Sequence, residues 1–126
     1  MAHYSYLSPD EKSVLIVEMS GTGAFQPCRL TPFDGSSPGH PVGPHGTCTS
    51  AGWSPDGTWM YFSAYVGGAS HLWRQRFPDG LPEQITFGAT EEEGLAVAPD
   101  GRSLVARRRE FVSMGGFSFA HLSISI

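Results

Sequence analysis

A short turn motif occurs three times along this chain of 126 residues at nearly constant spacing. The aspartates of successive copies are 46 and 44 residues apart, and an apolar, strand-like segment follows each copy, at 14–17, 60–63 and 104–107. The motif residues are Ser8, Pro9 and Asp10 in the first copy, Ser54, Pro55, Asp56 and Gly57 in the second, and Pro99, Asp100 and Gly101 in the third. A repeat of about 45 residues is typical of an array of similar units.

The motif has the chemistry of a tight turn between two strands. Serine can accept a nearby backbone N–H, proline fixes φ, and glycine takes the positive φ of the fourth position. Glu11 stands where the later copies have glycine. The first turn is therefore either strained or of a different type.

Glycine and proline interrupt nearly every window of the sequence. The chain has 16 Gly and 10 Pro, and its longest stretch without either is 102–114. Since an ordinary helix needs about 11–12 uninterrupted residues, the sequence predicts an all-β fold. Two copies also share a second Asp-Gly turn, at 34–35 and 79–80, which completes a four-stranded meander in each.

Four strands per period of about 44 residues are typical of a β-propeller blade. The sequence predicts about three consecutive four-stranded antiparallel blades, at 1–46, 47–89 and 90–126, the last one degenerate. Propellers usually close with about four to eight blades. Three blades would form an open arc, an incomplete ring with a bare face at each end, as in a fragment or a subunit completed by others.

The second copy carries a family resemblance. Its Trp-Ser-Pro-Asp-Gly turn, the aromatic strand 59–62, the segment Leu72-Trp73-Arg74 and the closing Gln84-Ile85-Thr86 resemble TolB-like, WD-repeat-like propeller repeats. Such repeats also occur in propellers of prolyl-oligopeptidase-type peptidases and beside bacterial kinase or regulator domains. The resemblance covers residues 4 to about 107 and implies a fold more than a function.

Charge and hydropathy restrict the partners. The net charge is −4, which disfavours a nucleic-acid surface, because that needs a basic excess. The longest aliphatic run is Val14–Val17, too short for a membrane span. The N-terminus lacks the pattern of a signal peptide, so the cytoplasm is the default expectation for the compartment.

No catalytic or cofactor motif retains its required context. Gly35–Gly39 matches the Gly-x-Ser-x-Gly nucleophile elbow around Ser37, but the proline-rich segment 40–44 cannot supply the helix that must follow. Gly21-Thr22-Gly23 begins like a phosphate loop but lacks a third glycine. We expect no enzymatic activity and no cofactor.

The cysteines and histidines do not form a metal motif. Cys28, Cys48, His40 and His45 lack the short paired spacing of a zinc site, so no metal is expected. Cys28 is expected to pack inside a blade. Two cysteines twenty residues apart leave the existence of a disulfide open.

Candidate binding residues come from loops expected on the upper face of the ring. The strongest is the acidic run Glu91, Glu92 and Glu93, which would form a negative rim if it lies in the link between two blades; otherwise it is a solvated loop. In the resembling peptidases an acidic pair from the propeller holds the substrate's amino terminus. The remaining candidates are His45, Gly67 and Gly68.

Two other clusters have ordinary structural explanations. Arg107, Arg108 and Arg109 are expected at an exposed strand end, paired locally with acids, rather than on phosphate. The aromatic residues of the second copy are expected between blades, where exposed members would instead anchor a partner. They are Trp53, Trp59, Trp73, Tyr61 and Phe62.

These observations favour a non-catalytic binding or scaffold module that is part of a larger bacterial sensor, kinase-linked or regulatory protein. Its contact surface would comprise residues 44–49, 66–70 and 88–94, and its partner would be a protein, a peptide or another domain of a longer chain. The alternative is a piece of the substrate-gating propeller of a prolyl-oligopeptidase or dipeptidyl-peptidase-type serine peptidase. A third hypothesis is self-assembly, with further copies completing the ring.

The C-terminal segment departs from the repeat. Residues 108–126 contain no Asp-Gly turn, although the last ten residues alternate as a strand does. The segment is either a degenerate repeat or an altered reading of an ancestral chain.

Overall fold

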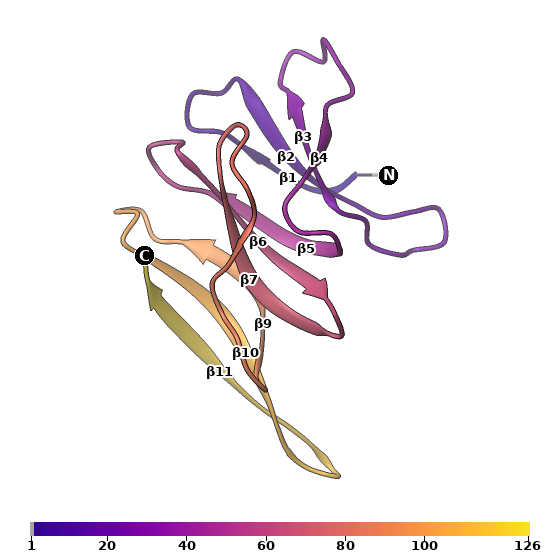
Figure 1. The fold of residues 1–126 in the computed structure, drawn as a ribbon, viewed down its shortest axis with the longest axis vertical. Coiled ribbons are helices and arrows are strands. Elements are labelled where there is room, and N and C mark those ends of the chain that lie inside the picture. The colour runs from indigo at the N-terminus through magenta and orange to yellow at the C-terminus, as the bar shows by residue number, and fades with distance from the viewer. Residues whose placement is uncertain (1) are drawn as a thin grey trace.

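The computed structural model describes residues 2–126, with side chains from Tyr4 onward, and every regular element in this range is a β-strand. The strands form three antiparallel sheets that follow one another along the chain (Figure 1). The prediction of an all-β, open array of blades is confirmed, except that the third sheet has three strands rather than four.

The first sheet has the order β1-β2-β3-β4 and the second β5-β6-β7-β8, each a simple meander. Their strands are β1 (Ala2–Leu7), β2 (Ser13–Glu18), β3 (Cys28–Pro32), β4 (His40–Val42), β5 (Thr47–Trp53), β6 (Trp59–Val66), β7 (Ala69–Arg76) and β8 (Glu83–Gln84).

The third sheet has the order β11-β10-β9. It contains β9 (Glu91–Val97) and a long hairpin of β10 (Ser103–Ser113) and β11 (Gly116–Ser125), which extends away from the other sheets (Figure 1). The alternating last ten residues therefore form the strand that the sequence predicts.

The sheets pack face to face through apolar side chains that alternate along β6. Met60 and Phe62, both fully buried, face the first sheet and join Leu15 and Val17 in one core. Tyr61 faces the opposite way and joins a second core with Leu95, Leu104 and other residues of the third sheet. Because successive strand residues point to opposite faces, one strand contributes to both cores.

The aromatic residues of the second repeat divide between these cores as inter-blade packing requires. Trp53 and Phe62 belong to the first core, and Trp73 packs against it. Tyr61 belongs to the second core, and Trp59 packs against it. The indole N–H of Trp53 also donates to the backbone oxygen of Tyr6 at 2.8 Å, which fixes the second sheet on the first.

A disulfide between Cys28 and Cys48 joins β3 of the first sheet to β5 of the second. Cys28 is buried, as expected, but its partner lies across the sheet boundary. Hydrogen bonds to backbone groups cross the same boundary. One is the bond from the Trp53 indole described above. In addition, the backbone N–H of Cys48 donates to the backbone oxygen of Gln26 at 2.9 Å, and the backbone N–H of Gly43 donates to the Gln75 side chain at 2.7 Å.

The three motif turns have the same backbone conformation. The N–H of the fourth residue donates to the oxygen of the first at 2.9 Å in every copy, and φ is +62° at Glu11, +76° at Gly57 and +71° at Gly101. Glu11 therefore keeps the turn type and adopts the left-handed conformation that suits glycine, which resolves the sequence alternative in favour of strain.

The glycines also let successive turns stack. A Cβ added at Gly101 would lie 3.0 Å from Cδ of Pro55, and one added at Gly57 would lie 3.8 Å from Cδ of Pro9. Each glycine thus lies beside the proline of the preceding turn, and the contact is tightest in the third copy.

We expect Gly101→Ala to destabilise the fold by about 1–2 kcal/mol, because it adds both left-handed strain and the contact with Pro55. Glu11→Gly should be neutral or stabilising by about 0.5 kcal/mol, because it relieves the same strain. Urea unfolding measures both changes. Gly21→Ala is the matched control, since Gly21 has ordinary φ and open space around it. Equal effects of the two alanine variants would contradict this account.

Candidate functional site

The loops expected to form a binding surface lie at one end of the second and third sheets, opposite the motif turns. His45 is exposed just before β5, and Gly67-Gly68 form the two-residue turn between β6 and β7 with φ of +62° and +91°. Two successive positive φ values are typical of a hairpin turn that matches strand twist. We call this region the link end.

The acidic run also lies at the link end, but it is not a loop. Glu91, Glu92 and Glu93 are the first three residues of β9, and Glu92 is completely buried. The expectation of three solvated carboxylates is therefore wrong. β9 pairs with β10 from Glu91 onward, so successive side chains of the run point to opposite faces of the sheet. The middle one, Glu92, points into the interface with the second sheet.

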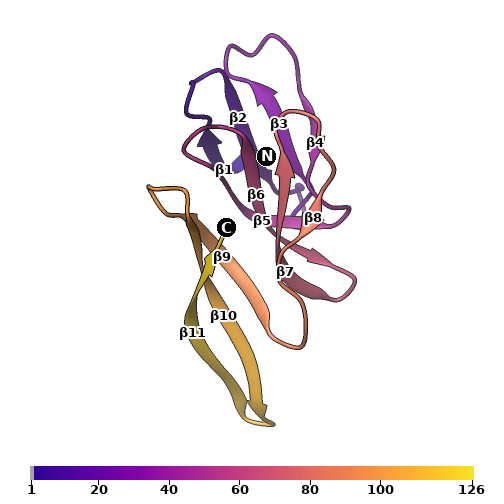
Figure 2. The ribbon, with the colours of Figure 1, turned by 60° about the vertical axis from the view of Figure 1, so that its left-hand side comes forward.

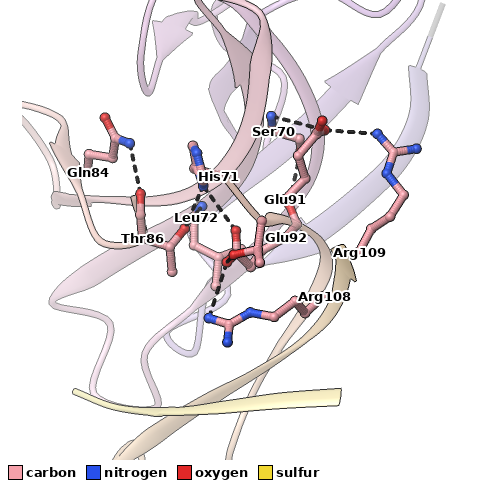
Figure 3. Close-up of polar contacts among 10 residues, drawn as sticks. Ser70, His71, Leu72, Gln84, Thr86, Glu91, Glu92, Arg108 and Arg109 are labelled. Atoms are coloured by element: carbon pink, nitrogen blue, oxygen red, sulfur yellow. Dashed lines mark hydrogen bonds and ion pairs between the residues drawn. The ribbon is translucent and has the colours of Figure 1, made fainter. Parts of the chain in front are cut away.

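Polar partners from the second and third sheets surround the buried carboxylate of Glu92 (Figure 3). Its Oε2 lies 3.0 Å from Nδ1 of His71, which is itself buried, and its Oε1 accepts from the Thr90 hydroxyl at 3.2 Å. The guanidinium of Arg108 lies 3.4 Å from Oε1. A buried carboxylate without such partners would be strongly unfavourable, so these contacts account for its burial.

The contacts continue into the second sheet. The Ser70 hydroxyl donates to the backbone oxygen of Glu92 at 3.0 Å. The Thr86 hydroxyl lies 3.2 Å from Nδ1 of His71 and accepts the backbone N–H of Leu72 at 2.9 Å. We call Ser70, His71, Thr86, Thr90, Glu92 and Arg108 the Glu92 network; it joins the two sheets by hydrogen bonds.

The two neighbouring glutamates differ in their surroundings. Glu91 is paired with Arg109 at 3.0 Å and accepts the backbone N–H of Ser70 at 3.4 Å (Figure 3). Glu93 points away from the Glu92 network and lines a hollow on the inner strands. Of the three acids, Glu93 is therefore the one that faces a space a ligand could enter.

This hollow has a volume of about 510 Å³ and lies where the first strands of all three sheets meet. Aromatic rings from the first sheet form one wall, and Glu93 and Arg107, opposite each other in the β9–β10 ladder, form the other. The lining residues are Tyr4, Tyr6, Phe25, Thr49, Ser50, Glu93, Gly94, Leu95 and Arg107. We call it the inner-strand hollow.

Hydroxyl groups hold the base of the inner-strand hollow. Ser50 Oγ lies 2.5 Å from Ser63 Oγ, which lies 2.8 Å from the Thr49 hydroxyl, and Ser50 Oγ accepts the backbone N–H of Leu95 at 3.2 Å. Burial raises the pKa of Tyr6, despite its opposing hydrogen bond with Ala51. The Tyr6 hydroxyl therefore stays protonated at neutral pH.

Sequence reasoning identified part of this hollow and missed the rest. The link 88–94 contributes Glu93 and Gly94, and 44–49 contributes Thr49. Tyr4, Tyr6 and Phe25 were not singled out, since a lone aromatic residue in a strand or loop usually belongs to a core. Tyr4 and Tyr6 are two residues apart in β1, and residues with this spacing point to the same face of a strand. This spacing is the signal that could have identified them.

The repeated turn motif has a structural role in the first two copies. Ser8 donates to Asp10 and Ser54 to Asp56, both at 2.6 Å, and each serine oxygen accepts the N–H of the residue that starts the next strand region, Ser13 or Trp59. The third copy has Ala98 in the serine position, so no serine hydroxyl of the motif donates to Asp100, which accepts the N–H of Arg102 at 2.9 Å.

The residues of the weaker sequence motifs lie apart from the link end. Ser37 is exposed between β3 and β4, and its Oγ accepts the N–H of Gly39 at 3.2 Å. The strand that follows confirms that the helix of a nucleophile elbow is absent there. Gly21–Gly23 form a turn between β2 and β3, and both cysteines are oxidised to the disulfide.

Within residues 2–126, no group of three or more His, Cys, Asp or Glu side chains is arranged to hold a metal ion. The same residues include no helix with the length and hydropathy needed to cross a membrane. Arg108 and Arg109 pair with Glu92 and Glu91, as local pairing predicts, whereas Arg107 lies over the ring of Phe119 at 3.9 Å. The expected strand end is wrong, because all three arginines lie in the middle of β10.

No protein-family model and no curated protein sequence matches this chain. Solved structures do. The chain is similar to the putative TolB from Agrobacterium tumefaciens over 99% of its length, with a TM-score of 0.74 and 20% identity. It is similar to TolB from Acinetobacter baumannii over 97%, with a TM-score of 0.75 and 22% identity. The chain has a TolB-like β-propeller fold.

The chain spans 50% of the length of the Agrobacterium protein and 30% of the Acinetobacter protein. A third similar structure is the AtxE2 isopeptidase, with a TM-score of 0.57 and 18% identity over 86% of this chain and 21% of that one. At these identities the likeness concerns the fold alone. The resemblance seen in the sequence is confirmed to that extent.

We expect Glu92→Gln to destabilise the protein by about 2 kcal/mol, because an amide NH₂ would face His71 or Thr90 at a buried site built for a carboxylate. Thermal or urea unfolding gives the change. Glu83→Gln is the control: its pair with Arg74 is partly exposed, so its loss should cost less than about 1 kcal/mol. If both variants lost the same free energy of unfolding, the Glu92 network would contribute no more to stability than an exposed ion pair.

The hydrogen bond from Ser54, together with those from the side chain and N–H of Thr58, lowers the pKa of Asp56 to about 2. Because the folded-state value is depressed, the stabilisation is present above the ordinary carboxyl pKa and is lost as pH falls from about 4 to about 2. Ser54→Ala should raise the Asp56 pKa in an NMR titration. Ser36→Ala should raise that of Asp34, which Ser36 lowers, and leave Asp56 unchanged.

Proposed function

We propose that this chain is a non-catalytic binding module that receives a protein or peptide segment in the inner-strand hollow and on the adjoining link end. The observation that carries the proposal is the composition of that hollow, which three aromatic residues line together with Glu93 and Arg107. Ligand sites typically combine apolar and aromatic walls with a few convergent polar groups.

The chemistry of the hollow suits a peptide better than a small metabolite. Tyr6 offers a large ring and a protonated hydroxyl, which together give contact area and a directional hydrogen bond. Glu93 lines the hollow, so a segment that crosses it can place a basic side chain against this carboxylate.

A second hollow extends the same surface toward the motif turns. It has a volume of about 480 Å³ and shares Tyr6 and Leu95 with the first, while Trp53 and Val97 contribute apolar walls. The two hollows follow the first strands of the three sheets and would accommodate an extended segment.

The alternative, part of a peptidase-gating propeller, has weaker support. Its amino-terminus-binding acids would have to be free, but Glu92 is buried in its network and Glu91 is paired with Arg109. Likeness to the AtxE2 isopeptidase covers the fold only. We therefore retain the binding module and propose that the chain has no catalytic activity of its own.

A displayed library of random linear peptides, selected on the immobilised chain, tests the proposal. We expect enriched peptides whose affinity falls about tenfold or more in Glu93→Lys, which reverses one charge of the hollow. Glu83→Lys, a matched reversal outside the hollow, should bind them unchanged. The proposed function would be contradicted if no peptide were enriched or if both variants bound the peptides equally. Turnover of ester or peptide substrates by the purified chain would also contradict it.

A further inference from the structure

The third sheet differs from the other two at its outer edge. In the first two sheets a short fourth strand, β4 or β8, covers the third strand, whereas among residues 2–126 nothing pairs with the outer side of β11 (Figure 2). β11 is ten residues long and most of it is exposed. Within residues 2–126, the outer edge of the third sheet is therefore a long open strand, whereas the inner edges are β1, β5 and β9.

The other two outer strands are poor templates for pairing. β4 has three residues including Pro41, between Gly39 and Gly43 with positive φ, and β8 has only two residues. Natural proteins blunt exposed edges with short strands, prolines and charges. β11 has none of these devices, because residues 116–126 include no proline and no Lys, Arg, Asp or Glu.

The backbone hydrogen bonds show which groups of β11 face outward. The N–H of Ile126 donates to the oxygen of Arg102 at 2.9 Å, next to the register pair Ser103↔Ser125. Since bonding alternates along an antiparallel ladder, even-numbered residues of β11 bond to β10. The odd-numbered residues direct their N–H and C=O to the open edge: Phe117, Phe119, His121, Ser123 and Ser125.

We propose that two copies of this chain associate through antiparallel pairing of their β11 strands, centred on His121. In this register Phe119 lies opposite Ser123 and Phe117 opposite Ser125, so each large side chain meets a small one. The nine residues from 117 to 125 all pair, and every outward backbone group meets a partner. The result is one six-stranded sheet, an ordinary size.

A second copy suits this edge because β11 is neutral and self-complementary. A charged partner segment would find no counterion on β11, since the arginines of the same face already lie over rings, Arg107 over Phe119 and Arg109 over Phe117 at 4.9 Å. Because residues 116–126 contain no Lys, Arg, Asp or Glu, this pairing brings no like charges of these residue types together. This interface is separate from the inner-strand hollow, so it does not depend on the proposed function.

Sedimentation equilibrium of the full chain should give twice the mass of one chain. His121→Pro removes an outward N–H without removing a bond to β10, and should weaken the dimer about tenfold or more through the two lost central hydrogen bonds. His121→Ala keeps the N–H and should remain dimeric. Circular dichroism and thermal unfolding verify that both variants fold. A monomeric wild-type chain, or a dimer equally stable in both variants, would overturn the proposal.

A cysteine pair tests the register. In the proposed pairing the two His121 Cα atoms are about 5.5 Å apart, within the range that a disulfide spans. His121→Cys should therefore form a covalent dimer under mild oxidation, whereas Ser123→Cys, whose site faces Phe119 of the other copy, should not. The native cysteines are already joined and do not interfere. Crosslinking of Ser123→Cys but not of His121→Cys would overturn the proposed register. A dimer that associates through the sheet faces would crosslink in neither variant and would overturn the strand pairing.

Discussion

Face-to-face packing of the middle sheet against both of its neighbours is the constraint on which the rest of this structure depends. β6 supplies side chains to two cores at once, Phe62 toward the first sheet and Tyr61 toward the third. Neither outer sheet makes an apolar core with the other. Loss of the middle sheet would therefore expose both cores together, as expected for a stack of repeats in which each unit contacts its neighbours.

Different kinds of interaction hold the middle sheet to its two neighbours. The first interface is mainly apolar and carries the disulfide, with Trp53 donating across it to the first sheet. The second contains the Glu92 network, in which a buried carboxylate meets His71 and Arg108. Hydrogen bonds are directional, whereas apolar contacts tolerate sliding. The polar interface therefore fixes the register of the third sheet at the link end, which positions Glu93 beside the aromatic wall.

The sequence contained enough information for the repeat, the strand order and the placement of aromatic residues between blades. These features are local or periodic: a turn motif fixes a hairpin, and alternation along 59–66 fixes which residues share a face. The TolB-like fold followed from the same residues. The third sheet was correctly expected to depart from the pattern, but its long hairpin was not predicted.

What the sequence concealed depends on contacts between units. An acidic run usually indicates solvent, yet Glu92 is buried because residues of two other strands meet its carboxylate, and no local pattern encodes that meeting. The pairing of Cys28 with Cys48 likewise requires two sheets to be in contact. The inner-strand hollow combines residues from three sheets that are far apart in the sequence, so only the ends of its wall, such as Glu93, lay within predicted links.

The disulfide has a consequence for the integrity of the chain. Residues 29–47, which include β4 and the link to the second sheet, lie inside the loop that Cys28 and Cys48 close. A protease that cuts this segment would leave two pieces still covalently joined at the boundary of the first core. The peripheral strand could thus be cleaved or detached while the two sheets stay in place, until a reductant separates them.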